Sequence, residues 1–163
     1  MLPALPASTL IMADNVSLGT QVDTNTTVRV DHHFRVPAER VFDACLDPES
    51  ARKWLFTAPG GQITRCEIDA RAGGQFVIVD RRGDESIEHV GEYVEIRRPV
   101  RLVFTFTVPK YSPQITRVTI DIVVESSAGC ELTLTHEGVL LEWRGQTEEG
   151  WKMILANLER TLT

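Results

Sequence analysis

The stretch TEEGWKMILANLERTL, residues 147–162, decides the fold, because it predicts one amphipathic helix near the carboxyl end of the chain. Thr147 is the expected N-cap. Glu148 and Glu149 fall in the expected first turn, where carboxylates complement the positive end of the helix dipole. Apolar side chains recur with the 3.6-residue period of a helix and make a single stripe. This stripe consists of Trp151, Ile154, Leu155, Leu158 and Leu162. A helix with one apolar stripe needs an apolar surface to cover.

The segment before this helix predicts that surface, because its apolar residues alternate with period two, as in half-buried strands. Short sequences rich in Gly, Pro, Ser and Asp separate the alternating runs, and such turns join antiparallel neighbours. The expected strands are Gln62 to Asp69, Gln75 to Asp80, Ile87 to Ile96, Arg101 to Val108, Ile115 to Glu125 and Cys130 to His136.

The first part of the chain adds one strand and two short helices. Thr26 to Val36 alternates, with Val28, Val30, His32 and Phe34 on one face. Pro37 ends this strand and opens a helix, and Asp47-Pro48 breaks that helix and starts a second one, Pro48 to Leu55. The order is therefore strand, two helices, six strands, helix. It predicts an α+β fold in which a curved antiparallel sheet of about seven strands wraps around the long C-terminal helix, with bends at Gly73, Gly74 or Gly91.

Length and composition predict one domain, residues 26–163, preceded by a flexible tail, residues 1–25, within which Met12 is an alternative start. The net charge of −6 argues against a nucleic-acid partner. Three cysteines without CxxC spacing argue against a disulfide framework or a zinc site and favour a reducing cytoplasm. No apolar run is long enough for membrane insertion. We expect neither a metal nor a cofactor.

Several segments resemble a known family when taken in order. They are Val36-Pro37-Ala38-Glu39-Arg40-Val41-Phe42, Asp47-Pro48-Glu49 with Trp54, the Arg-x-Gly-Gly turn within Asp69 to Phe76, Gly91-Glu92-Tyr93, Pro99 to Thr105, Leu132 to His136 and Glu149 to Leu158. Together they resemble START-like (SRPBCC, helix-grip) domains over residues 26–162. The similarity is greatest to the branch named after the activator of heat-shock-protein-ninety ATPase, specifically its carboxy-terminal domain and small bacterial relatives.

This resemblance implies a helix-grip fold with a deep apolar cavity between the sheet and the long helix. Lipid carriers, hormone receptors, polyketide cyclases and co-chaperones share the fold, so the fold alone does not name a function. The candidate ligand-binding residues are Trp54, Phe76, Ile78, His89, Tyr93, Phe104, Phe106, Ile120, Trp151 and Leu155. His89 and Tyr93 share one strand face and are the candidate polar anchors. The aromatic and aliphatic residues equally suit a plain core.

Other polar residues have a structural interpretation beside a functional one. His32 and His33 are adjacent on a strand and point to opposite faces, so they cannot bind one ion together. His136 ends its expected strand, which favours a solvated position at the rim. Arg81-Arg82 and Arg97-Arg98 are expected to be solvated pairs. Arg65, Glu67, Asp69 and Arg71 alternate on one strand face and are expected to compensate each other at the surface; the alternative buries Glu67 or Asp69 as a general base.

Three functions follow as hypotheses. The first is a module that binds a small hydrophobic or amphipathic ligand without catalysis, and the absence of any GxSxG, HExxH, P-loop or Rossmann motif favours it. The second is an interaction protein that activates a chaperone ATPase. We expect that activity to be absent, because the larger family members carry an additional amino-terminal domain and no part of this sequence is long enough to match it. The third is a cyclase- or hydrolase-like enzyme that uses His89, Tyr93 or Glu67. An exposed edge strand also makes a homodimer a reasonable expectation.

Overall fold

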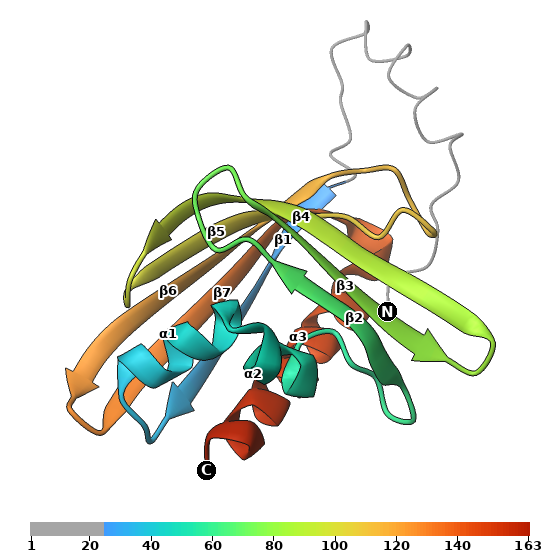
Figure 1. The fold of residues 1–163 in the computed structure, drawn as a ribbon. Coiled ribbons are helices and arrows are strands. Elements are labelled where there is room, and N and C mark those ends of the chain that lie inside the picture. Colours follow the sequence, from blue (N-terminus) through green and yellow to red (C-terminus); the bar gives the residue numbers. More distant parts are fainter. Residues whose placement is uncertain (1–24) are drawn as a thin grey trace, which may run out of the picture.

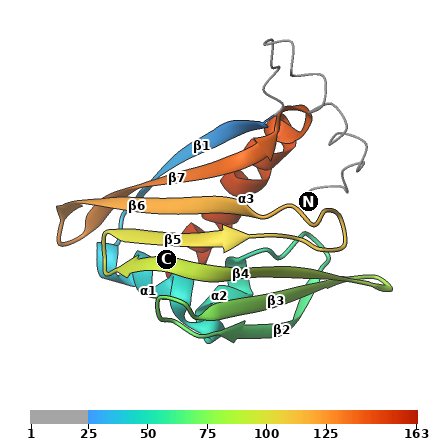
Figure 2. The ribbon, with the colours of Figure 1, turned by 90° about the horizontal axis from the view of Figure 1, so that it is seen from above.

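A curved antiparallel sheet forms most of the structure, a computed structural model that describes residues 25–163. The strands are β1 (Asn25–Phe34), β2 (Gln62–Ile68), β3 (Gln75–Arg82), β4 (Glu85–Arg97), β5 (Arg101–Phe106), β6 (Thr116–Ser126) and β7 (Gly129–Leu140). They form one seven-stranded sheet in the order β1-β7-β6-β5-β4-β3-β2 (Figure 2). Each predicted strand is present, so the expected meander is confirmed. The expected tail and the alternative start at Met12 concern residues 1–24, which lie outside the described part.

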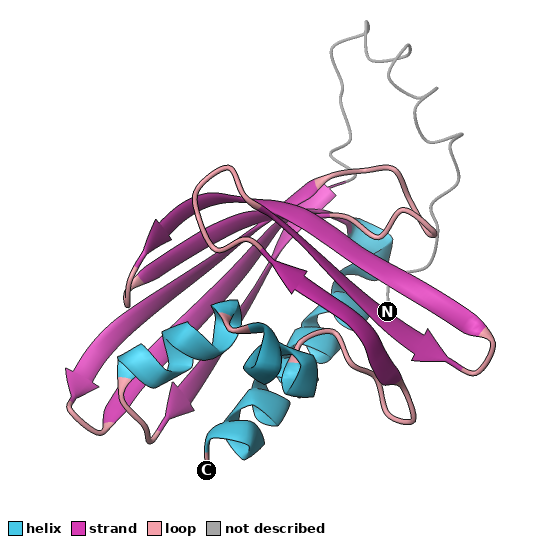
Figure 3. Cartoon of the chain, in the orientation of Figure 1, coloured by secondary structure: helices cyan, strands magenta, loops and turns pink. Residues whose placement is uncertain are grey.

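All the helices lie on the concave side of the sheet (Figures 1 and 3). They are α1 (Ala38–Leu46), α2 (Pro48–Trp54) and α3 (Arg144–Leu162), and a short 3-10 turn, Leu141–Trp143, leads into α3. The α+β architecture with a long C-terminal helix inside a curved sheet is thus the one predicted. Pro48 opens α2 at its first turn, and the Asp47 carboxylate accepts a hydrogen bond from the Glu49 amide as an N-cap.

The apolar stripe of α3 packs against the sheet. Trp151, Leu155 and Leu158 are buried against a core to which all three helices and every strand except β2 contribute buried residues; partly buried residues of β2 pack against this core. On β1, the alternation places Val28, Val30 and Phe34 in the same core. Each large apolar side chain buried in this way contributes roughly 1.5–3 kcal/mol relative to an exposed one.

The start of α3 differs from the prediction. The helix begins at Arg144, because the 3-10 turn continues directly into it, and its N-cap is Trp143 without a side-chain cap bond. Thr147 is therefore not the N-cap. Its side chain is buried, only 5% exposed, on the face of α3 that meets the sheet.

The end of β7 also differs from the prediction. β7 continues beyond His136 to Leu140, because it remains paired with β1 as far as Asn25 opposite Leu140. The pairing passes a bulge at Thr26/Thr27, near Gly138 in the left-handed region (φ +89°). His136 consequently lies inside the sheet and is fully buried, so the expectation of a solvated rim position is wrong.

Gly91 allows β4 to approach β5 closely. A Cβ atom at this position would collide with the carbonyl oxygen of Thr105 and with the ring of Phe76. The register between β4 and β5 becomes irregular shortly afterwards, between Tyr93 and Glu95. Of the predicted glycines, Gly91 within β4 and Gly74 at the turn before β3 both leave no room for a side chain, since a Cβ at Gly74 would collide with the Asp69 carbonyl oxygen.

We therefore expect Gly91→Ala to lower the free energy of unfolding by about 1–3 kcal/mol or more, because a backbone carbonyl cannot move aside cheaply. Gly145→Ala is the control: it lies in α3 with open space around its Cβ position and should stabilise the helix by up to about 1 kcal/mol. Urea unfolding of both variants measures the difference. Equal stability of Gly91→Ala and the parent chain would contradict the packing described here.

Candidate functional site

Two adjoining spaces lie between the sheet and the helices. The inner cavity has a volume of about 20 Å³, which is room for about one water molecule. The outer pocket has a volume of about 100 Å³ and opens beside the amino-terminal half of α3. The interior beneath Trp151 and Leu155 is thus largely filled by side chains, and the larger space lies nearer the surface.

The sequence-predicted residues divide between the two spaces. His89 and Phe106 line the outer pocket, and Trp151 lines both. Ile78 is fully buried in the core but lines neither of the two. The remaining predicted residues line the inner cavity: Trp54, Phe76, Tyr93, Phe104, Ile120 and Leu155.

Phe56 separates the two spaces, together with Trp151, since these are the two residues that line both. Its ring lies flat against His89 (centroids 4.6 Å apart, planes 2° apart) and Phe106 (5.0 Å, 20°), and it meets Trp151 edge-on at 5.8 Å. Sequence reasoning missed Phe56 because it follows α2 in a loop, where no periodicity indicates burial.

A chain of hydrogen bonds fixes His136 and Trp151. The indole Nε1–H of Trp151 donates to His136 Nδ1 at 3.0 Å, so the proton of the neutral imidazole lies on Nε2. That Nε2–H donates to Thr116 Oγ1 at 2.7 Å, and the Thr116 hydroxyl donates to the Phe106 carbonyl at 3.0 Å. Burial lowers the pKa of His136 to about 4, which keeps it neutral. The chain therefore ties α3 to β5, β6 and β7.

His89 has the opposite tautomer. Its Nδ1 lies 3.2 Å from the Ile78 carbonyl oxygen, so Nδ1 carries the proton and donates it there. Burial is the main cause that lowers the pKa of His89 to about 4, so the imidazole is neutral and Nε2 is an acceptor. His89 is 4% exposed and lines the outer pocket. His89 thus adds an acceptor to the outer pocket.

A buried ion pair supports the rim of the outer pocket. The Asp80 side chain is completely buried, and its Oδ2 accepts from Arg82 Nε at 2.6 Å and from the Ala58 amide at 3.3 Å. This contact holds the loop after α2 against β3, where a side chain at Gly61 would collide with Asp80. The Arg82 side chain is 28% exposed and lines the outer pocket, so the prediction of a simple solvated arginine is wrong for this residue.

Thr147 provides a second polar group in the outer pocket. Its Oγ1 is buried and has no hydrogen-bond partner among the described residues. A buried polar atom without a partner costs free energy, and native proteins contain few of them. The prediction placed Thr147 at the start of the helix, so this role was not recognised from the sequence.

The other candidate acids and bases lie elsewhere. Glu67 is exposed and accepts hydrogen bonds from Arg65, which lowers the pKa of Glu67. Asp69 is also exposed, and its carboxylate accepts a hydrogen bond from Arg71. The predicted wet face of β2 is thus confirmed. Tyr93 is buried, and burial raises the pKa of its phenol. Burial likewise raises the pKa of the Cys45 thiol to about 12, so this cysteine is a packing residue.

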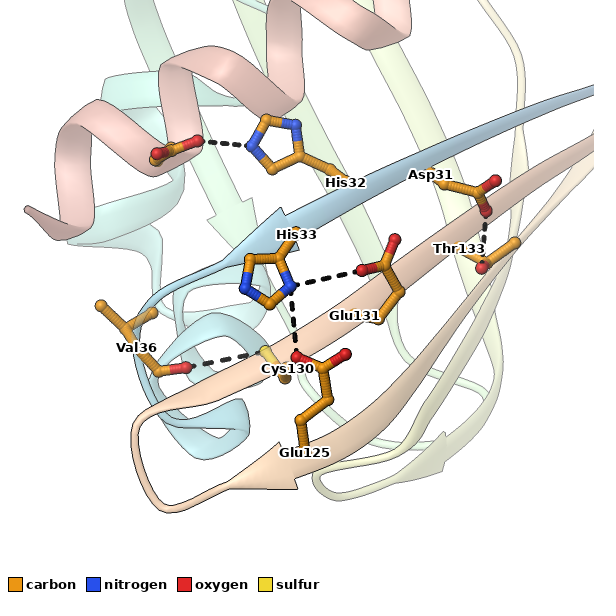
Figure 4. Close-up of polar contacts among 9 residues, drawn as sticks. Asp31, His32, His33, Val36, Glu125, Cys130, Glu131 and Thr133 are labelled. Carbon is orange, nitrogen blue, oxygen red and sulfur yellow. Dashed lines mark hydrogen bonds and ion pairs between the residues drawn. The ribbon is translucent and has the colours of Figure 1, made fainter.

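His32 and His33 lie on opposite faces of β1, as predicted (Figure 4). His32 faces α3, where its Nε2 lies 2.6 Å from a Glu159 carboxylate oxygen. His33 lies on the outer face, and its Nδ1 is 3.2 Å from Glu125 and 3.4 Å from Glu131. These three outer side chains are 38–50% exposed and compensate one another as a solvated cluster.

Comparison with known proteins agrees with this architecture. Residues 35–163 match the family described as activator of Hsp90 ATPase homolog 1-like protein. The chain belongs to this family. The match covers α1, α2 and every element from β2 to α3.

Solved structures similar to this family member have the same fold. A crystal structure of a protein from Chromobacterium violaceum is 26% identical, with a TM-score of 0.75, and the match covers 82% of this chain and 94% of that one. The solution structure of an AHSA1-like protein from Aeromonas hydrophila is 20% identical, with a TM-score of 0.71 and coverage of 84% and 92%. No curated protein matches the chain.

Within residues 25–163, no helix combines the length and apolar character that a membrane crossing requires.

The two buried histidines make stability depend on pH. Their pKa values lie near 4 in the folded chain and near 6.5 when unfolded, so the unfolded chain takes up protons first. We expect the free energy of unfolding to be highest above pH 6.5 and to fall as the pH decreases toward 4. The expected loss is about 2 kcal/mol per histidine between pH 6.5 and 5. Urea unfolding at several pH values measures it.

His136→Gln is expected to remove about half of this pH dependence, because His89 still titrates. His33→Gln, at an exposed position, should leave it unchanged. Stability that does not vary between pH 6.5 and 5 would show that the two imidazoles are not held neutral by burial.

Proposed function

We propose that this protein binds a small hydrophobic or amphipathic ligand in the outer pocket, as a binding module and not as an enzyme. The observation that supports the proposal is the unpartnered Thr147 hydroxyl in an otherwise mostly apolar wall. Ligand pockets characteristically combine apolar walls with a few convergent polar groups. Here the polar groups are Thr147 Oγ1, His89 Nε2 and the guanidinium of Arg82.

The protonation of these groups favours binding over catalysis. A general base works best when its pKa is near the working pH, and His89 has a pKa of about 4. Burial raises the pKa of Tyr93, which makes its phenolate inaccessible at neutral pH. Glu67 is exposed on β2, where it pairs with Arg65. The pocket groups are therefore suited to hydrogen bonding and poorly suited to proton transfer.

Gly150 offers a way to fill the outer pocket from α3. It lines the pocket, and the position of its missing Cβ has open space around it. We expect the parent chain to bind the neutral apolar dye N-phenyl-1-naphthylamine with a saturable increase in fluorescence. Gly150→Leu should weaken this binding about tenfold or more, because the leucine side chain occupies the space that the dye requires.

Gly145→Leu is the matched control, since Gly145 lies in the same helix with open space around it but does not line the pocket. It should bind the dye as the parent chain does. Absence of saturable binding in the parent chain, or equal weakening by both substitutions, would contradict the proposal.

A further inference from the structure

We propose that the ligand of the outer pocket is a planar aromatic carboxylate, whose ring takes the place that the Phe56 ring occupies in this structure. This inference rests on the proposed binding function and adds the chemical class of the ligand. Three observations carry it: an aromatic floor, a loop residue that covers this floor, and one cationic side chain at the edge.

The aromatic floor consists of His89 on β4 and Phe106, the last residue of β5. Their ring centroids are 6.1 Å apart with planes 21° apart, so the two rings are nearly parallel, and the Phe56 ring contacts both of them. Trp151 stands across this floor at 59° to Phe106. A flat ring therefore fits between the floor and the Trp151 wall, with stacking on one side and an edge contact on the other.

Phe56 already lies on this floor as a ligand ring would. It contacts both floor rings with nearly parallel planes and meets Trp151 at 62°. Its backbone is in the left-handed region (φ 61°), the one residue other than glycine in that region among residues 25–163. Such a conformation is strained and persists because the ring is held by its surroundings. A ligand ring that replaced Phe56 would remove the contact that maintains this strain.

Arg82 offers an anion a hydrogen-bonding site at the pocket, and the Asp80 carboxylate beside it pairs with part of its charge. Arg82 is the one formally charged side chain among the residues that line it, since His89 and His136 are neutral. Asp80 holds Arg82 through Nε alone, so the two Nη groups have no hydrogen-bond partner in the described part of the chain. A guanidinium with free Nη groups binds carboxylates well, and the Thr147 hydroxyl can donate a further hydrogen bond.

Isothermal titration with 2-naphthoate, naphthalene-2-carboxamide and decanoate at pH 7.5 tests the inference. The parent chain should bind 2-naphthoate more tightly than the neutral carboxamide and more tightly than the flexible decanoate. Phe56→Gly should tighten 2-naphthoate binding about tenfold, because the competing ring is gone and glycine accepts the left-handed backbone without strain. Phe42→Ala is the control: it truncates a buried phenylalanine that lines neither space, and should not tighten binding.

Arg82→Lys keeps a positive charge beside Asp80 but loses the planar fork. It should reduce the preference for 2-naphthoate over the carboxamide about tenfold, because the carboxylate loses a bidentate, charge-assisted contact that the carboxamide cannot form. Circular dichroism first establishes that each variant is folded; a variant that is not folded is replaced by Phe56→Ala or Arg82→Gln.

Equal affinity for decanoate and 2-naphthoate, no gain in Phe56→Gly, or an unchanged preference in Arg82→Lys would overturn the inference. If N-phenyl-1-naphthylamine still binds the parent chain in that case, the proposed binding function stands and only the ligand class is wrong. If neither the dye nor any of the three probes binds, both proposals fail together.

Discussion

The hydrogen bond from Trp151 to His136 is the contact on which the arrangement of the interior depends. It joins two buried side chains, one from α3 and one from β7, and it continues through Thr116 to the Phe106 carbonyl. Apolar packing presses α3 against the sheet but is not directional. The hydrogen-bond chain supplies a direction, and it fixes Trp151 as the wall that the inner cavity and the outer pocket share.

The same contact explains why the interior holds two small spaces and not one deep cavity. With Trp151 fixed, Phe56 closes the remaining gap by lying on His89 and Phe106. The inner cavity is then too small for anything larger than about one water molecule. Two of the buried polar atoms without partners in the described part of the chain lie on the outer side, Thr147 Oγ1 in the pocket wall and Asp80 Oδ1 beside Arg82; a third, Trp143 Nε1, lies elsewhere. The chain thus combines a packed apolar core with an outer pocket that carries a few polar groups, and the Phe56 ring stands between the two spaces.

The period of the apolar residues predicted the fold because the two main parts of the fold, the sheet and the long helix, are regular. The stripe of α3 and the alternation in β1 to β7 each follow from which side chains must be buried, and the structure confirms them. The site was predicted less completely. Phe56 lies in a loop without a period. Arg82 pairs with Asp80, two residues earlier on β3, but the complete burial of Asp80 depends on the folded sheet and the loop after α2, which the local sequence does not indicate. His136 was placed at a strand end because the pairing of β7 with β1 to Leu140 depends on partners far apart in sequence.

The most direct measurement is the protonation of the two buried histidines by ¹⁵N nuclear magnetic resonance of the folded chain at pH 6. The structure predicts two neutral imidazoles with opposite tautomers: His136 protonated at Nε2, because Trp151 donates to its Nδ1, and His89 protonated at Nδ1, because it donates to Ile78. Two imidazoles with the same tautomer, or a charged imidazole at either position, would contradict the hydrogen-bond chain that holds α3 and the acceptor that His89 presents to the pocket.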